Sequence, residues 1–438
     1  MENGGGRREH TRCASVRGTT MSGAAEAGAA GGTDDAAGGT GIWQRVAQDL
    51  ADDLAVDAID RDRAGKPPYD EVARLRDSGL TAALVPPGAR GAGTGWRDAC
   101  DIVRRIAVAD GSMGELLGRH YVLSWTARFL AEPGRAADLE SRAAHEQWLL
   151  AGGTGPDGTD ETRHPGDPGA GLTLTRTGDG YRLNGRRALP TAVDTADRLV
   201  LDAVRVSGGD ALVVLVDPHH PGAGRTPVTD RLGQRLTGAG TVVFEDVPVG
   251  PSDVIGAAAH DEDAVAPSAT LAPLALRLML AQVVLGVAEG ALAEARDLAR
   301  AASHARPVNG TGLCPDLPPG ADADVLFAFG ELALAVHSAS AVVDRATAAM
   351  ARSLDAGPEL DTERRADTAA LVAAAETVTA RSALHAGEGV LELADAEGLD
   401  RFWRNIRVLT GRGPAAPLLR SLGDHFLHGA RASAAPWS

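Results

Sequence analysis

Apolar residues recur at helical spacing from Ile42 to about Glu132. In WQRVAQDLADDLAVDAIDRDR, one side of a helix collects Trp43, Val46, Leu50, Leu54 and Ile59. The next segment, YDEVARLRDSG, ends at Gly79, a residue suited to the position just beyond a helix. Two more helices are expected in WRDACDIVRRIAVAD and GSMGELLGRHYVLSWTARFLAE. The pattern predicts an N-terminal α-helical domain over residues 41–147.

The pattern changes to short runs of β-branched residues between residues 148 and 257. LTLTRTGDGYRLNGRRALP has the form of a strand, a turn at Gly178-Asp179-Gly180 and a second strand. DRLVLDAVRV, DALVVLVDP and GTVVFEDVPV are further strand candidates bounded by turn residues. Residues 153–171 are rich in Pro, Gly and Asp, which predicts a mobile loop. We therefore expect an antiparallel β-domain here.

Helical spacing returns in the last part of the chain, over residues 270–303, 322–354, 362–394 and 415–431. Before the last helix, in FWRNIRVLTGRGPAAPLLRSLGDHFL, Arg404 and Arg407 frame what we expect to be a short extended run and a turn. The fold class predicted is an α+β multidomain protein. It has an N-terminal helical domain, a middle antiparallel β-domain and a C-terminal four-helix bundle over residues 268–431.

Composition narrows the class of protein. The chain has 438 residues, of which 44% are hydrophobic and 23% charged, as in ordinary globular proteins. Its net charge of −16 disfavours nonspecific binding to nucleic acid or to anionic membranes. Residues 1–40 have almost no large apolar side chains, which predicts a disordered extension. Met21 is an alternative start of the chain.

Signals for export, membrane insertion and metal binding are weak. The three cysteines are far apart with no CxxC pair, so neither a disulfide framework nor a zinc site is indicated. No apolar segment typical of a secretory signal is seen near Met1. The longest apolar run, residues 271–288, contains Arg277 and Gln282 and indicates a buried helix instead of a membrane span. We expect a cytoplasmic protein without a bound metal.

The order of domains and several local strings resemble the acyl-CoA dehydrogenase superfamily, from about residue 42 to 431. The strings are LRDSGLTAALVPPGARGAG, DGSMGELLGRHY, GYRLNGRRALPTAVDTADRLV, DRLGQRLTGAGTVVFEDVPVGPSDVIG and RFWRNIRV. The resemblance is to the flavin-dependent monooxygenase branch, typified by dibenzothiophene and sulfone monooxygenases. It implies reduced FMN delivered by a separate flavin reductase, with FAD as the alternative cofactor. It also implies a small-molecule substrate and a homotetramer or homodimer. The flavin performs the difficult chemistry in such enzymes, while the protein positions it and excludes water.

The turn after Arg407 separates two activities within this superfamily. Alignment on the two arginines places Gly413 where acyl-CoA dehydrogenases carry the glutamate that abstracts a proton. A general base must be titratable, so Gly413 disfavours that reaction. The oxygenases have two histidines in this turn, and here both are missing. What remains is Leu409 beside the pocket, Thr410 as a hydroxyl donor and Arg412 as a permanent cation.

The resemblance implies further site residues in the helical and β-domains. His120 matches a histidine near the flavin ring, where it would hydrogen-bond or carry a proton. Tyr121 and Trp125 either line the substrate pocket or fill the core. On the flavin side, the resemblance points to Leu189, Thr191, Gln234 and Arg306, the last as a partner of the phosphate. Pro190 replaces a small polar residue of the relatives and removes a backbone donor.

Three functions stay open on the sequence alone. The first is a two-component flavin-dependent monooxygenase acting on a small or medium organic molecule, in natural-product tailoring or sulfur-compound oxidation. The second is a member of the superfamily without redox chemistry, used for binding or as a scaffold, because both histidines are missing. The third is an acyl-CoA dehydrogenase whose base comes from the acidic segment 388–400. Motifs of serine hydrolases, P-loop proteins and zinc proteases are absent from the sequence.

Overall fold

The computed structural model describes residues 34–85, 93–153, 171–258, 267–305, 323–394, 396–411 and 415–429. The N-terminal part consists of helices α1 (Asp34–Ala55), α2 (Ala58–Ala64), α3 (Tyr69–Asp77), α4 (Trp96–Ala109), α5 (Gly111–Ser124), α6 (Thr126–Leu130) and α7 (Pro133–His145). Helix α1 begins seven residues before the expected boundary at residue 41. Gly79 follows the end of α3 with a φ of 76°, the left-handed conformation that its sequence position predicted.

The β-domain forms one sheet of eight strands in the order β6-β7-β3-β2-β4-β5-β8, with β1 paired to β4. Its strands are β1 (Leu150–Gly153), β2 (Thr173–Thr177), β3 (Gly180–Leu189), β4 (Arg198–Arg205), β5 (Ala211–Val216), β6 (Ala223–Pro227), β7 (Gly240–Val249) and β8 (Val254–Ala257). The sheet is mixed and mostly antiparallel, since β4 runs parallel to both β1 and β2. The expectation of a purely antiparallel domain missed these two pairings because they join strands that are distant in the sequence.

The C-terminal part contains α8 (Leu271–Ala305), α9 (Ala323–Ala356), α10 (Thr362–Leu393), α11 (Asp400–Thr410) and α12 (Ala415–His428). Helix α11 corrects the expectation of an extended run around Arg404 and Arg407. Phe402, Ile406 and Leu409 lie at helical spacing on its buried face. Burial of this face against the rest of the helical body outweighs the strand preference of the β-branched Ile406 and Val408.

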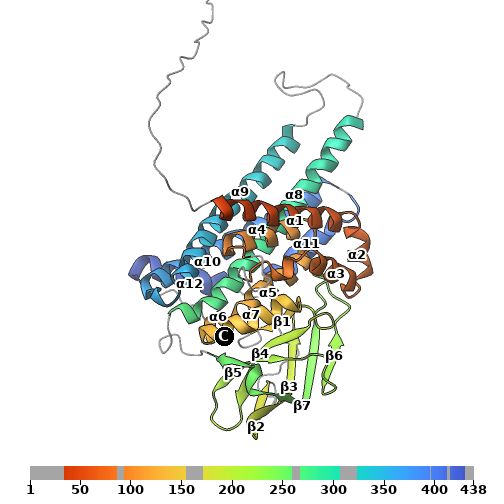
Figure 1. The fold of residues 1–438 in the computed structure, drawn as a ribbon. Coiled ribbons are helices and arrows are strands. Elements are labelled where there is room, and N and C mark those ends of the chain that lie inside the picture. Colours follow the sequence, from red (N-terminus) through yellow and green to blue (C-terminus); the bar gives the residue numbers. More distant parts are fainter. Residues whose placement is uncertain are drawn as a thin grey trace, which may run out of the picture.

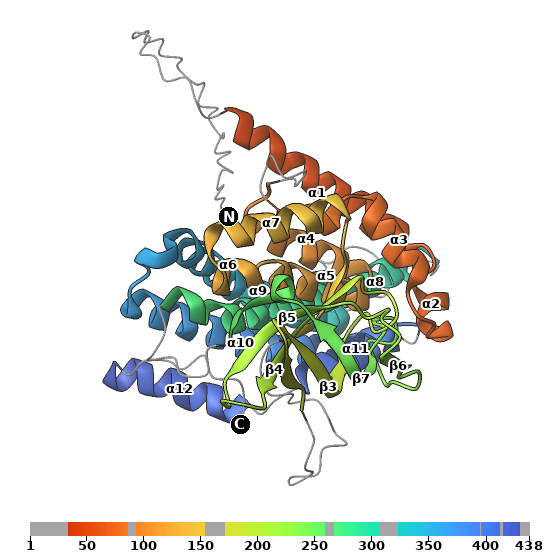
Figure 2. The same cartoon turned by 60° about the horizontal axis from the view of Figure 1, so that its bottom comes forward.

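The helices form one body, and the sheet packs against it beside α5, α6 and α7 (Figure 1). Seen from the turned view, α1 and α12 lie on opposite sides of this body (Figure 2). One hydrophobic core cluster runs through all three parts and includes Leu54, Ile106, Phe244, Leu278 and Val343. The domains therefore share a core, which fixes the position of the sheet relative to the helices.

Two helices, over Pro267–Ala301 and Ala323–Glu359, are apolar and long enough to span a membrane by length and composition alone. In the first, which contains α8 as far as Ala301, 72% of the most apolar window is buried inside the protein. The sequence-based expectation of a buried helix at residues 271–288 is thus confirmed. In the second, which contains α9, only 17% of that window is buried. The ends of α8 and α9 extend beyond α1 (Figure 1), and exposed apolar side chains on α9 include Leu326, Phe327 and Leu334.

Helices α4 and α8 approach each other closely at Gly290. A Cβ atom added there would lie 2.2 Å from the carbonyl oxygen of Val108 and 3.0 Å from the ring of Phe402. Backbone cannot move aside as a flexible side chain can, so any larger residue must separate the two helices.

We predict that Gly290→Ala lowers the free energy of unfolding by about 1–3 kcal/mol, the usual range for overpacking a core. The matched control is Gly423→Ala on α12, where an added Cβ meets nothing within 4 Å. That change should leave the melting temperature unchanged or raise it, since Ala favours a helix over Gly by about 1 kcal/mol. Thermal melts of both variants test the contact, and equal melting temperatures would contradict it.

Candidate functional site

The three parts of the fold meet at Gln234, in the loop before β7. Its side chain is fully buried, and its Nε2 donates to Glu115 Oε2 at 2.8 Å and to the carbonyl oxygen of Gly111 at 3.1 Å. Its backbone N–H donates to Asn405 Oδ1 at 2.7 Å. Gln234 thus joins the β-domain to α5 and α11 at once. A φ of 53° at a non-glycine residue shows that these contacts hold its backbone in a strained conformation.

Buried charges at this junction are paired. Asp110 caps α5, with its Oδ1 accepting from the backbone N–H groups of Ser112 and Met113 at 2.9 and 3.1 Å. Its other oxygen accepts from Arg61 at 2.7 Å. Glu115, fully buried, accepts from Arg119 Nε at 2.8 Å as well as from Gln234. The network is built to hold the helix start against the loop, since a buried charge without partners is costly.

A second strained turn lies after β3, next to the predicted flavin residues. Leu189 and Thr191 are 2% and 1% exposed, and Ala192 has a φ of 58°. The N–H groups of Ala192 and Val193 donate to the carbonyl oxygens of Thr237 and Gly238, both at 2.7 Å. The turn is therefore fastened to the loop that contains Gln234. Strained backbone of this kind gathers at functional sites, which makes the turn a candidate for ligand contact.

His120 is buried, with both ring nitrogens engaged by the backbone. The N–H of Leu150 donates to Nδ1 at 3.0 Å, so the ring proton lies on Nε2, which is 2.7 Å from the carbonyl oxygen of Thr81. Burial lowers the pKa of His120 from 6.5 to about 4, against the opposing effect of the bond to Thr81. This histidine ties α5 to β1 and to the segment around Thr81 as a neutral group.

Tyr121 and Trp125 differ in their surroundings. Tyr121 is fully buried, and its hydroxyl donates to the carbonyl oxygen of Leu80 at 2.8 Å, so it belongs to the core. The ring of Trp125 lies 5.5 Å from that of Trp96 and under the guanidinium of Arg128. The indole N–H groups of both tryptophans are buried and find no hydrogen-bond partner in the described part of the chain. Unpaired buried donors are rare in native proteins, and a bound ligand or water is the usual partner of such a group.

The C-terminal candidates lie at the end of α11. Leu409 is buried in the core cluster, and the Thr410 hydroxyl donates to the carbonyl oxygen of Ile406 at 2.7 Å. Arg306, Arg412 and Gly413 lie outside the described residues, as do residues 1–33 and most of the loop at 153–171. The structure thus brings Leu189, Thr191 and Gln234 to one connected loop pair, while His120 and Tyr121 lie on α5.

The acidic segment 388–400 offers no buried carboxylate among its described residues. Glu388 and Glu392 are exposed, Glu397 pairs with Arg63, and Asp400 accepts from Arg404 at 2.9 Å. An exposed or ion-paired carboxylate is not within reach of a proton on a substrate held in a closed pocket. The described geometry gives no support for a relocated catalytic base.

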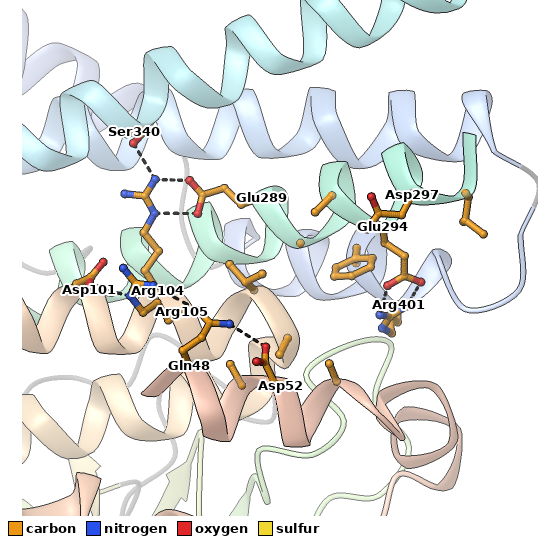
Figure 3. Close-up of a pocket in the computed structure, with 18 of the residues that line it drawn as sticks. Gln48, Asp52, Asp101, Arg104, Arg105, Glu289, Glu294, Asp297, Ser340 and Arg401 are labelled. Atoms are coloured by element: carbon orange, nitrogen blue, oxygen red, sulfur yellow. Dashed lines mark hydrogen bonds and ion pairs between the residues drawn. The ribbon is translucent and has the colours of Figure 1, made fainter. Parts of the chain in front are cut away.

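A large cleft of about 900 Å³ lies between α1, α4, α8, α9 and α11 (Figure 3). Six carboxylates and three arginines line it: Asp52, Asp101, Glu289, Glu294, Asp297, Asp344, Arg104, Arg105 and Arg401. The arginines are paired within it, Arg104 with Glu289, for example. An excess of negative charge disfavours a phosphorylated cofactor, and none of the predicted site residues lines this cleft.

Metal ligands are not grouped in the part of the chain that the structure covers. Within residues 34–429, apart from the gaps, no three His, Cys, Asp or Glu side chains are placed to hold a metal ion. The adjacent His219 and His220 lie in a turn after β5, where His219 is exposed.

Comparisons with known proteins agree with this architecture. The family model for the acyl-CoA dehydrogenase C-terminal domain matches residues 278–411. A dibenzothiophene monooxygenase of Rhodococcus qingshengii is 31% identical over 397 residues, covering 88% of this chain and 93% of the relative. A probable FMNH2-dependent monooxygenase, SfnC of Pseudomonas putida, is 27% identical over 402 residues, covering 88% of this chain and 95% of SfnC.

Solved structures show the same fold. TdsC of Paenibacillus sp. A11-2, in complex with FMN and indole, superposes with a TM-score of 0.79 at 28% identity, over 89% of this chain and 98% of TdsC. Methanesulfinate monooxygenase MsuC of Pseudomonas fluorescens gives 0.77 at 26% identity, over 90% and 98%.

The fold and its matched C-terminal domain define a member of the acyl-CoA dehydrogenase superfamily. Within it the chain belongs to the branch of FMNH2-dependent monooxygenases that includes the dibenzothiophene monooxygenases. This outcome confirms the resemblance seen in the sequence. Sequence reasoning did not single out Asp110, Glu115 or Asn405, although an Asp before Gly-Ser-Met is a recognisable helix cap.

The neutral, buried state of His120 has a consequence for stability. Its folded pKa, about 4, is below the ordinary value of 6.5, so the unfolded chain takes up a proton first as the pH falls. We predict that this one group lowers the free energy of unfolding between pH 6.5 and 4 by about 1.4 kcal/mol per pH unit.

Chemical denaturation of the parent and of His120→Gln over this range tests the prediction. The variant loses one titrating group, so its stability should fall less steeply with decreasing pH, whatever its stability at pH 7. The control is His145→Gln, which removes an exposed histidine from α7. A constant stability difference between parent and His120→Gln from pH 7 to 4 would contradict the assignment.

Proposed function

We propose that this protein is the oxygenase component of a two-component system and oxygenates a small or medium organic molecule. The observation that carries the proposal is the 31% identity to a dibenzothiophene monooxygenase along 93% of that enzyme. FMN is the cofactor proposed, because TdsC is seen with FMN and SfnC is described as FMNH2-dependent. Sulfur compounds and natural-product intermediates are the substrate classes to test first.

We assign the described residues at the end of β3 to the flavin ring. Apolar Leu189 and the hydroxyl of Thr191 stand on a backbone that two hydrogen bonds of 2.7 Å hold in place. Rigid placement of few polar groups in an apolar wall suits a planar cofactor. Reduced FMN and O2 together supply one oxygen atom to the substrate, which leaves oxidised FMN and water as the other products.

The roles proposed for the remaining residues follow from the resemblance to the flavin-dependent monooxygenases and, where the structure describes the residue, from its contacts. Arg306 is assigned to the flavin phosphate, and Gln234 to holding the loop that supports the turn. Arg412 is assigned to donating hydrogen bonds at the reacting end of the pocket. Thr410 is assigned to accepting one there and not to donating it, because its hydroxyl already donates to the carbonyl oxygen of Ile406. Trp125 has a buried N–H without a partner among the described residues, which supports it as a substrate contact. Leu409 gives an apolar wall.

His120 and Tyr121 were predicted to act in catalysis and in the substrate pocket. Because the backbone occupies both nitrogens of His120 and the hydroxyl of Tyr121, we assign them to positioning α5 beside the pocket. A proton carried by His120 would require breaking its bond from Leu150 first.

The partners proposed are a flavin reductase and further copies of this chain, in the cytoplasm. The largely uncovered apolar window of α9 supports a homotetramer or homodimer, since exposed apolar helices of this length usually meet another surface.

A flavin titration tests the proposal first. The protein should bind FMN, with reduced FMN tighter than the oxidised form, and a reductase with NADH should then drive oxygen incorporation from labelled O2 into an added sulfide or indole. If the protein binds FMN but oxygenates none of the added substrates, the proposed substrate classes are wrong. Failure to bind either form of FMN or FAD would refute the monooxygenase and favour a member without redox chemistry.

Thr191→Val tests the cofactor contact. Valine keeps the shape and removes the hydroxyl, so we predict that FMN binds about 2- to 10-fold more weakly, the value of one ordinary hydrogen bond. Thr175→Val, on the exposed side of β2, is the matched control and should bind FMN as the parent does. Unchanged affinity in Thr191→Val would remove Thr191 from the flavin site.

A further inference from the structure

The loop before β7 is held against α11 by contacts at three consecutive residues. Arg404 Nη1 donates to the carbonyl oxygen of Leu232 at 3.0 Å, and Asn405 Oδ1 accepts from the N–H of Gln234 at 2.7 Å. Gly233, between them, lies directly on the helix, since a Cβ atom added there would come within 2.3 Å of the carbonyl oxygen of Arg404. The loop therefore cannot move closer to α11, and the two hydrogen bonds oppose its moving away.

The other end of the same loop holds the turn after β3. The N–H of Ala192 donates to the carbonyl oxygen of Thr237, and the N–H of Val193 donates to that of Gly238, both at 2.7 Å. Within the loop, the hydroxyl of Thr237 donates to the carbonyl oxygen of Gln234 at 3.0 Å, and both side chains are fully buried. The 232–238 loop is therefore a short link that is bonded to α11 at one end, to the β3 turn at the other and to itself between them.

Backbone strain marks both attachment points. Gln234 has a φ of 53° and Ala192 a φ of 58°, in a region that residues other than glycine rarely adopt. Such conformations persist only where the surroundings impose them, and at Gln234 the bond to Asn405 is one of the contacts that do so. Asn405 is only 8% exposed, so water has little access to replace this bond if it is lost.

The helix that bears Asn405 also bears the proposed apolar wall of the pocket. Leu409 follows Asn405 by four positions on the same face of α11, and both side chains are buried. The hydroxyl of Thr410 is bonded to the carbonyl oxygen of Ile406, which keeps Thr410 within the helix. Since an α-helix rises about 1.5 Å per residue, Leu409 and Thr410 lie about 6–8 Å along the axis from Asn405. A shift of α11 at Asn405 therefore moves these two residues as well.

We infer that Asn405 is a positioning residue for the oxygenation proposed above, an inference that rests on that proposed function. Through the 232–238 loop, Asn405 fixes the distance between the end of α11 and the turn with Thr191, and thereby the width of the pocket between Leu409 and the flavin. A pocket that is too wide misplaces the substrate and admits water. Reduced FMN and O2 then give oxidised FMN and hydrogen peroxide, and the substrate gains no oxygen atom.

Hydrogen exchange of the whole protein without FMN tests the link itself. Asn405→Leu removes the acceptor of the Gln234 N–H. We expect the N–H groups of Ala192 and Val193, which bond to the far end of the loop, to exchange about 5-fold faster or more, because a buried donor left unpaired shifts a local opening by at least that factor. Asn405→Asp keeps an acceptor oxygen and should restore slow exchange. If Asn405→Leu does not fold, Asn405→Ser replaces it, because serine is too short to reach the Gln234 N–H and adds no bulk.

The matched control is Ser353→Ala, which removes the buried hydrogen bond of 2.8 Å between the hydroxyls of Ser353 and Thr368. This bond joins α9 to α10, away from the 232–238 loop. Ser353→Ala should lower the melting temperature and leave the exchange of Ala192 and Val193 at the parent rate. It separates a loss of the link from a general loss of stability.

Turnover with FMN, a reductase and an accepted substrate then tests the positioning. Asn405→Leu should lower product formation by up to about 100-fold, the loss that a misplacement of about 1 Å can cause, and should release a larger share of the consumed O2 as hydrogen peroxide. Asn405→Asp and Ser353→Ala should keep the parent's share.

The inference is overturned if Asn405→Leu leaves the exchange of Ala192 and Val193 or the hydrogen peroxide share unchanged, if Asn405→Asp restores neither, or if Ser353→Ala changes both as much. A parent protein that neither binds FMN nor oxygenates a substrate would instead refute the proposed function, and the exchange experiment would still decide whether Asn405 holds the link.

Discussion

The set of hydrogen bonds around Gln234 is the constraint on which the rest of the structure depends. One side chain and its own backbone N–H reach α5 and α11 from the β-domain, and all of these contacts are buried. In a low dielectric such bonds are strong, and removing one partner leaves others unpaired at a cost of about 1–3 kcal/mol each. The shared core holds the domains together, while the hydrogen bonds of Gln234 fix the position of the β-domain relative to the helices.

The two loops fastened together at this junction explain how one fold can keep a site rigid at a domain boundary. The turn after β3 bonds to the loop at Thr237 and Gly238, and that loop bonds through Gln234 to the helices. Strain at Ala192 and Gln234 persists because the surroundings fix both positions. Positions that are held this way are suited to aligning a ligand from two domains.

The helices, the strand–turn–strand around Gly178 and the three-part order were predictable, since they depend on local spacing and turn residues. The parallel pairing of β4 with β1 and β2 was not, because it joins distant segments. Helix α11 was missed because a short run with Ile406 and Val408 has no local feature that excludes a strand. Among site residues, His120 was located correctly on its helix, but the backbone groups that occupy its ring come from segments 30 or more residues away.

The little-covered apolar window of α9 affects how the free energy of unfolding of this chain has to be defined. If another copy covers that window in solution, the free energy of the folded state contains an association term that grows with protein concentration. Melting temperatures measured on dilute and concentrated samples would then differ for the same sequence. Any effect of a substitution on α9 would combine folding with assembly, and the folded monomer would not be the proper reference state.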